Sequence, residues 1–272
     1  MKKLLLSALL FVSIVASAAD TTKVKRAFYF TWGYTRAWYT KSDIHLKDVS
    51  GKNHPATGKY ANYDFTLYGA QAHDQSDFDK LKDVINITIP QFVCRGGLRL
   101  NDKWDLEINY DHTKYVMTYN QTLRISGQID GRPVSGDTLV DHAKFLHFEH
   151  TDGANFWMFN AVRKFKIWQP IPQFRLSWVA KAGAGIVFPR TDVTIFGERL
   201  NNNWHVAGYI GGIESGLRIQ FLKRGFFEFV GKGSFANYTN ALVLGKGNGS
   251  ANHHFFAGQL TMTMGMEFNR VK

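Results

Sequence analysis

The strand-like stretch Phe255–Phe268 constrains the fold more than any other part of the chain. Alternate positions from Phe256 to Phe268 are apolar or small, and the positions between them are small or polar. A period of two indicates a β-strand with one apolar and one polar face. An average strand has roughly 5–6 residues, and a tilted strand needs roughly 9–11 to cross a bilayer. The stretch is longer than either, so we expect it to be the closing strand of a membrane β-barrel.

The N-terminus has the pattern of a secretory signal peptide. Lys2 and Lys3 precede a largely apolar run from Leu4 to Val15, and small residues follow that run. A basic segment, a short apolar segment and a small-residue cleavage site are the three parts of such a signal. We therefore expect residues 1–18 to be the signal peptide and residues 19–272 to be one outer-membrane barrel domain.

Composition narrows the class of protein further. No other stretch has 18 uncharged apolar residues, yet aromatic residues make up 15% of the chain. An exported, aromatic-rich chain without membrane helices is either a soluble periplasmic β-protein or an outer-membrane barrel, and strand length favours the barrel. The formal charge of +11 suits contact with anionic outer-membrane lipids and lipopolysaccharide. Export makes nucleic acid an unsuitable partner, and no cofactor is expected.

Connection lengths predict the topology. We expect eight antiparallel strands, at residues 26–39, 84–100, 104–117, 155–168, 174–188, 204–221, 226–238 and 255–268. The connections after the second, fourth and sixth strands are short, and the others are long. Short periplasmic turns and long extracellular loops alternate in this way in outer-membrane barrels. A ten-stranded wall is the alternative, if Tyr63–Tyr68 or Thr122–Ile129 joins it.

The positions that would face the barrel interior collect charges of both signs. They are Asp105, Glu107, Asp111, Arg175, Lys181, Glu214, Arg218, Glu228, Lys232 and Glu267. The interior of an eight-stranded barrel is just wide enough for side chains. We therefore predict a charge-paired network that plugs the lumen, and a proton or ion pathway is the alternative role for the same residues.

The strand number, loop pattern and signal peptide resemble the small outer-membrane barrels of the OmpX, OmpA-transmembrane and PagL type. This resemblance covers the whole mature chain as architecture and includes no shared motif. The blocks Ser42–His45, Tyr63–Tyr68 and Asp111–Tyr115 also resemble uncharacterised outer-membrane proteins of Bacteroidota. The resemblance implies an integral outer-membrane protein and brings no assigned activity with it.

The long loops hold the candidate catalytic residues. A Ser/His/acid set is available from Ser42, Asp43 and His45, and Asp111 and His112 stand at the outer end of a predicted strand. Asp111 and His112 point to opposite faces of that strand, so they cannot simply hydrogen-bond each other. The His-x-Ser pair that PagL-type lipid A deacylases carry does not occur in the sequence.

Histidines near carboxylates in the loops are candidate metal ligands. His147 and His150 are spaced by three, in a segment that the sequence does not identify as a helix. The spacing is not diagnostic of a metal, and solvated loop residues are the alternative.

Three functions remain open at this point. The first is an outer-membrane barrel whose loops bind lipopolysaccharide or another envelope protein, or serve a structural role. The second is a membrane-surface hydrolase of lipid A or phospholipid. The third is a narrow channel for small solutes.

Overall fold

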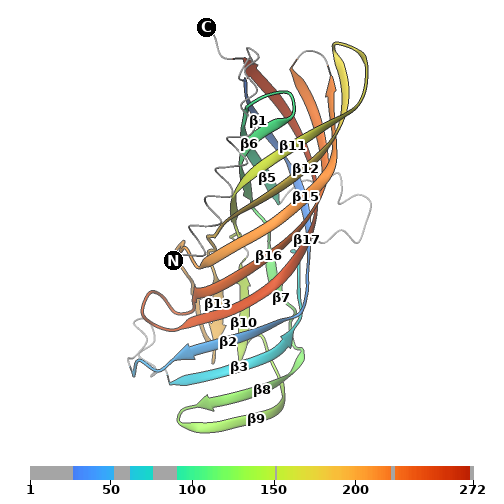
Figure 1. The fold of residues 1–272 in the computed structure, drawn as a ribbon. Helices are drawn as coiled ribbons and strands as arrows, with labels where there is room; N and C mark the ends of the chain where they lie inside the picture. The colour runs from blue at the N-terminus through green and yellow to red at the C-terminus, as the bar shows by residue number, and fades with distance from the viewer. Residues whose placement is uncertain (1–26, 52–61, 76–90, 151, 222–223, 270–272) are drawn as a thin grey trace, which may run out of the picture.

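The computed structural model describes residues 27–51, 62–75, 91–150, 152–221 and 224–269 (Figure 1). The predicted signal peptide, residues 1–18, lies outside these ranges, and so do residues 84–90 of the predicted second strand. Among the described residues, no helix is long and apolar enough to cross a membrane.

Eight antiparallel strands close a ring, which confirms the predicted fold class. In ring order they are β1 (Ala27–Tyr39), β5 (Phe92–Arg99), β6 (Trp104–Asp111), β11 (Phe156–Ile171), β12 (Phe174–Val187), β15 (Gly208–Phe221), β16 (Gly225–Leu242) and β17 (Ser250–Asn269). The ring closes where β1 pairs with β17, from Ala27 opposite Asn269 to Tyr39 opposite Ala257.

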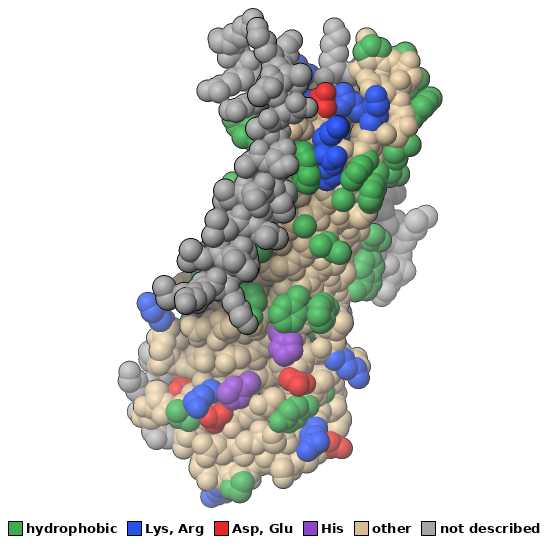
Figure 2. Space-filling model, in the orientation of Figure 1, with side chains coloured by type: hydrophobic (Ala, Val, Ile, Leu, Met, Phe, Trp, Pro, Cys, Tyr) green, Lys and Arg blue, Asp and Glu red, His purple; other side chains and the backbone are tan. Residues whose placement is uncertain are grey.

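The outer surface of the ring is apolar, as a lipid-facing wall requires. On β17 the alternate side chains from Phe256 to Phe268 that point outward are large, and Phe256, Leu260, Met262, Met264, Met266 and Phe268 are 49% to 62% exposed. The residues between them, such as Gln259 and Thr261, are buried inside. Figure 2 shows apolar side chains along the barrel wall. Each square ångström of such surface costs about 25 cal/mol in water, so the wall is suited to a bilayer.

Several predicted boundaries are wrong; the strand predicted over residues 204–221, for example, begins only at Gly208. The predicted strand over residues 104–117 ends at Asp111, and Tyr115–Met117 forms a separate strand, β7, in another sheet. The predicted long loop before β17 is mostly strand, because β16 and β17 continue to pair as far as Leu242 and Ser250. These two strands therefore project well beyond the closed ring.

The long connections fold against this projection instead of forming irregular loops. β2 (Ser42–Asp48) pairs with the start of β17, and β3 (Tyr63–Ala70), β8 (Thr122–Ile129) and β9 (Arg132–Leu139) follow it in the same sheet. The ten-stranded alternative is wrong, because β3 and β8 extend the sheet beyond the ring and do not enter its wall. Figure 1 shows β2, β3, β8 and β9 at the end of the molecule remote from the last residues of β17.

A second sheet completes this part of the molecule. Its strands, in order, are β14 (Glu198–Asn201), β13 (Asp192–Ile195), β10 (Leu146–His150), β7 and β4 (Ala72–His73). We call the strands outside the ring, β2–β4, β7–β10, β13 and β14, the cap. Side chains of both cap sheets, such as Leu46, Phe65 and Phe148, meet in one apolar core.

The core of the cap continues into the mouth of the barrel. Phe156, Met158, Ile210 and Phe255, which lie on ring strands and point inward, belong to the same buried cluster as the cap residues. The cap is therefore seated on the barrel by apolar packing.

Candidate functional site

The barrel lumen contains a dense network of ion pairs. Glu228 lies at its centre: its carboxylate accepts hydrogen bonds from Lys181 Nζ at 2.5 Å, Arg218 Nε at 2.7 Å and Arg95 Nη1 at 3.3 Å. Glu107 accepts two bonds from Lys181 Nζ, at 3.0 and 3.1 Å. All five side chains are almost fully buried. Buried charges are stable only when they are paired in this way.

The network continues toward both ends of the barrel. Toward the cap, Lys232 Nζ donates to Asp111 at 2.6 Å and lies 3.8 Å from Glu214. Toward the short turns, Arg218 Nη1 donates to Asp105 at 3.1 Å, and Asp105 also pairs with Lys164. Asp105 and Asp111 are six residues apart on β6, so the chain of charges spans about 20 Å of the lumen.

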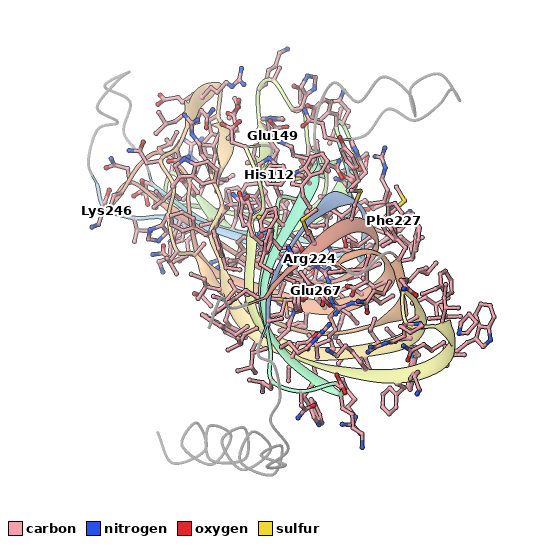
Figure 3. All side chains as sticks on the ribbon, turned by 90° about the horizontal axis from the view of Figure 1, so that it is seen from above. His112, Glu149, Arg224, Phe227, Lys246 and Glu267 are labelled. Carbon is pink, nitrogen blue, oxygen red and sulfur yellow. The ribbon has the colours of Figure 1, made fainter. Side chains whose placement is uncertain are left out.

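The charges of this network balance. Six carboxylates meet six basic side chains: Asp105, Glu107, Asp111, Glu214, Glu228 and Glu267 with Arg95, Arg99, Lys164, Lys181, Arg218 and Lys232. Figure 3 shows Glu267 inside the ring and Phe227 pointing away from it. Because alternating charges fill the lumen, no uniform field remains in it to select ions of one sign.

The structure brings together nine of the ten residues that the sequence placed in the lumen. Arg175 lies apart from the network: within the described part of the chain it pairs with no carboxylate, and its side chain is half-buried near the short turns. Arg95, Arg99 and Lys164 were missed. For Arg95 the available signal was the Gly96-Gly97 pair that follows it on an alternating strand. A glycine inside a strand often marks a place where a large neighbouring side chain comes close.

Apolar packing closes the lumen above the charges. Tyr115 stacks on Phe255 with ring centroids 4.9 Å apart, and Tyr39 contacts both rings. The Tyr39 hydroxyl donates to the carbonyl of Lys114 at 2.6 Å, which ties this layer to the chain leaving β6. The mouth of the barrel is thus covered by the core of the cap.

The candidate catalytic residues are not assembled into a catalytic set. On β2, Ser42 points into the buried face, whereas Asp43 and His45 point outward, so the predicted Ser/His/acid set is split. His45 pairs with Asp64 at 2.7 Å, and Asp43 accepts a bond from the Gly69 amide at 2.8 Å. Hydrogen bonds from Lys47 and His45 lower the pKa of Asp64.

The side chains of Asp111 and His112 also point to opposite sides of the barrel wall, as expected for adjacent residues of a strand. Asp111 belongs to the lumen network, whereas His112 packs outside it on Phe92, with ring centroids 5.0 Å apart. His112 Nδ1 lies 2.8 Å from Asn155 Oδ1, and that oxygen also accepts the Tyr110 hydroxyl at 2.7 Å. His112 therefore forms a polar contact with Asn155 and the Tyr110 hydroxyl at the barrel rim.

The two candidate metal ligands, His147 and His150, lie on opposite faces of the cap. His150 is fully buried, with Nε2 3.2 Å from Nε2 of His253, and both rings stack on Tyr238. Burial lowers the pKa of His150 to about 3 and lowers that of His253 well below its ordinary value. These imidazoles are therefore neutral and form a hydrogen-bonded pair within an aromatic core.

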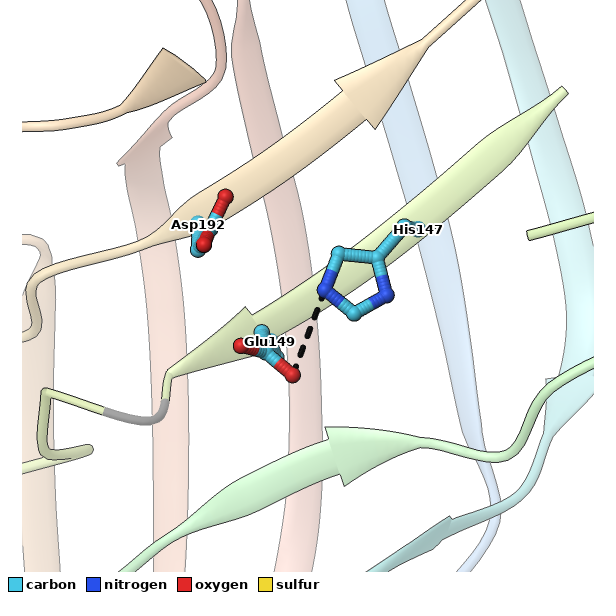
Figure 4. A group of neighbouring side chains, drawn as sticks. All are labelled: His147, Glu149 and Asp192. Carbon is cyan, nitrogen blue, oxygen red and sulfur yellow. Dashed lines mark ion pairs between the residues drawn. The ribbon is translucent and has the colours of Figure 1, made fainter. Parts of the chain in front are cut away.

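His147 instead lies in a group of ligand-type side chains on the outer face of the second cap sheet. Its Nε2 is 3.2 Å from Glu149 Oε2, and Asp192 stands across from Glu149 on β13 (Figure 4). One ligand atom from each of these three residues lies within 4.8 Å of the others. Sequence spacing missed Asp192, because only the pairing of β10 with β13 brings it there.

The outer wall of the barrel also carries an apolar groove of about 630 Å³ over β15, β16 and β17. Trp38, Ile213 and Phe256 border it, and Gly233 and Gly258 form part of its floor. A Cβ atom at either glycine would meet no atom within 4 Å. The groove lies on the lipid side of the wall, and none of its lining residues belongs to the lumen network.

Known proteins resemble this chain only in architecture. No protein-family model matches the chain, and no curated protein matches it. Similar solved structures include neisserial surface protein A, with 10% identity, 88% of this chain and 96% of that chain covered, and a TM-score of 0.33. The outer membrane protein OprG from Pseudomonas aeruginosa has 9% identity, coverage of 91% and 97%, and a TM-score of 0.37.

A third similar structure is Ail, the attachment invasion locus protein of Yersinia pestis, with 9% identity, coverage of 91% and 100%, and a TM-score of 0.32. At these identities and TM-scores the superpositions are loose. The barrel assignment therefore rests on the strand register and the apolar wall of this chain.

Proposed function

We propose that this protein is an integral outer-membrane barrel that presents a folded cap at the cell surface and conducts no solute. A connected network of five carboxylates and five basic groups through the lumen, with the separate Arg99–Glu267 pair, carries this proposal. We expect the paired side chains, which fill the lumen, to leave no continuous path for ions. The apolar core over the mouth adds a second closure.

The cap is the part of the molecule suited to binding. Exposed basic side chains on the cap and its connections include Lys41, Lys47, Arg124, Arg132, Lys144, Arg199 and Lys246. Together with the formal charge of +11, they favour anionic lipopolysaccharide headgroups as the surroundings, and another envelope protein as a further partner. The signal peptide, the extracellular side of the cap and a relationship to Bacteroidota proteins are parts of the same proposal.

Neither alternative function has an observation in its favour. A hydrolase of lipid A or phospholipid needs a nucleophile beside a base, and Ser42 and His45 point to opposite faces of β2. A narrow channel needs an open lumen, whereas ion pairs occupy this one: the Glu228 carboxylate at its centre pairs with three basic side chains.

Planar-bilayer recording tests the closed lumen. We expect the refolded protein to give no unitary conductance steps in 1 M salt, and the variant Lys47→Ala, altered only on the cap, to behave in the same way. A variant with Glu107→Ala, Lys181→Ala and Glu228→Ala removes the central side chains, and it should give steps once Tyr115→Ala and Phe255→Ala also open the apolar layer above them. Regular steps from the unaltered protein would overturn the proposal.

Cysteine labelling of intact cells tests the orientation. In a Cys94→Ser background, Lys246→Cys on the cap should react with a membrane-impermeant maleimide, and Arg224→Cys at a short turn should not (Figure 3). Both sites should react after the cells are lysed. Labelling of Arg224→Cys alone in intact cells would reverse the orientation.

A further inference from the structure

Three side chains on the outer face of the cap converge because of strand geometry. His147 and Glu149 are two apart on β10, so they share the face opposite to Phe148 and His150. Antiparallel pairing places Asp192 directly opposite Glu149, and Thr194 opposite His147. An imidazole and two carboxylates therefore meet on a rigid two-strand platform.

The two carboxylates of this group are held where they repel each other. Like charges directly opposite on paired strands are destabilising. Glu149 and Asp192 are 9% and 4% exposed, so solvent screens them poorly. A cation bound between the two carboxylates would relieve this repulsion.

Arg199 supplies part of that positive charge from one side. It forms a two-bond pair with Asp192, at 3.0 and 2.6 Å, and this pairing raises the pKa of the guanidinium. The Arg199 side chain is 67% exposed, however, so it can leave Asp192 for solvent at little cost. The guanidinium is thus a replaceable counter-ion.

We propose that His147, Glu149 and Asp192 bind a divalent first-row transition metal, with Zn²⁺ as the representative ion. One imidazole and two carboxylates form a ligand set that suits such ions. Zn–N and Zn–O bonds of about 2.0–2.1 Å in a tetrahedron place neighbouring ligand atoms about 3.3 Å apart. The distance of 3.2 Å between His147 Nε2 and Glu149 Oε2 matches this separation. The ligand atoms of all three residues lie within 4.8 Å of one another, so rotamer changes would bring them to the distances that the ion needs.

Three protein ligands leave one position of a tetrahedral ion for water or a partner's side chain. The side chains of His147 and Glu149 keep 11% and 12% of their surface exposed, so solvent has a narrow access to that position. Within the described residues this is the one group of three or more His, Cys, Asp or Glu side chains that has such geometry.

Titration of the metal-free protein tests the site. The full-length barrel, purified in detergent by an affinity tag without histidines and treated with a chelator, is titrated with Co²⁺ and followed by its visible absorption. Competition by Zn²⁺ then gives the Zn²⁺ affinity. We expect one equivalent of tight binding, and a loss of at least about 10-fold in affinity for His147→Ala or Glu149→Gln.

Two further variants separate a metal site from an ion-pair cluster. Arg199→Gln should strengthen Zn²⁺ binding, because the competing guanidinium is removed from Asp192. His45→Ala should leave the affinity unchanged, since His45 pairs with Asp64 in the other sheet of the cap. Heat-dependent gel mobility confirms folding of each variant. The proposal is overturned if the unaltered protein binds Zn²⁺ no better than His147→Ala, or if Arg199→Gln weakens binding.

Discussion

The buried pair of His150 and His253 should make the cap sensitive to acid while the barrel stays intact. Both imidazoles are neutral in the folded cap, and burial is the main cause of their lowered pKa values. The groups stacked around them are Tyr115, Tyr238 and Phe148, which bring no carboxylate that would hold an imidazolium. Proton uptake therefore accompanies unfolding of the cap.

The sign and size of the effect follow from linkage. The unfolded chain binds a proton below about pH 6.5, whereas His150 in the cap binds one only near pH 3. Stability is thus fully present above pH 6.5 and is lost as the pH falls below it. Each pH unit costs about 1.4 kcal/mol per histidine, so at pH 4.5 His150 alone removes about 2.7 kcal/mol. A matching contribution from His253 would bring the loss to about 5 kcal/mol.

Hydrogen exchange measured by mass spectrometry, corrected for the intrinsic effect of pH, gives the opening free energy of each strand. Between pH 7 and pH 4.5 we expect it to fall by about 3–5 kcal/mol for β10 and β7, with little change for β12 and β15. The double variant His150→Phe, His253→Phe should lose this dependence. It should be no less stable at pH 7, because it also removes the two unpaired Nδ1 atoms. An equal fall in the variant and the unaltered protein would refute the reasoning.

Three other perturbations have defined outcomes. Glu228→Gln leaves three lumen cations underneutralised and should lower the free energy of unfolding by about 3–5 kcal/mol, measured by urea unfolding in lipid vesicles; a change below 1 kcal/mol would contradict the central role of Glu228. Phe65→Ala empties part of the fully buried cap core and should cost about 3–5 kcal/mol there, seen as faster proteolysis of the cap with unchanged barrel gel mobility. Gly233→Ala should be tolerated in the same urea assay, whereas Gly216→Ala should not, because its Cβ would lie 1.9 Å from the Phe229 carbonyl oxygen; equal effects would show that the wall adjusts freely.

The membrane barrel could be predicted from sequence because its signal is local. Each ring strand alternates between lipid and lumen, and the stretch Phe255–Phe268 shows that alternation without interruption. Arg95 was missed for a local reason as well. The apolar odd positions Ile85, Ile87 and Ile89 set a phase in which Arg95 would face lipid. The sequence indicates a shift of phase at Pro90-Gln91, and only when this shift is carried on to Arg95 does its side chain face the lumen, where it is buried.

The cap could not be predicted, because its pairings join distant segments. β2 is short and reads as a polar loop until Ile44 pairs with His253, about two hundred residues away. The proximity of Asp192 to Glu149 likewise depends on β10 meeting β13. The pair of His150 and His253 shows the same limit, since only the fold brings these two distant histidines together.

β17 belongs both to the barrel wall and to the sheet of the cap, and this has a consequence for biogenesis. Its length pairs with β16, its membrane part pairs with β1, and its first residues pair with β2. Closure of the wall and completion of the surface domain therefore depend on the same segment. A chain in which this strand has not yet paired has neither a closed wall nor a complete surface domain, so the two are completed together. For the same reason, a one-residue deletion within β17 would shift the methionine row into the lumen and misalign both partners at once.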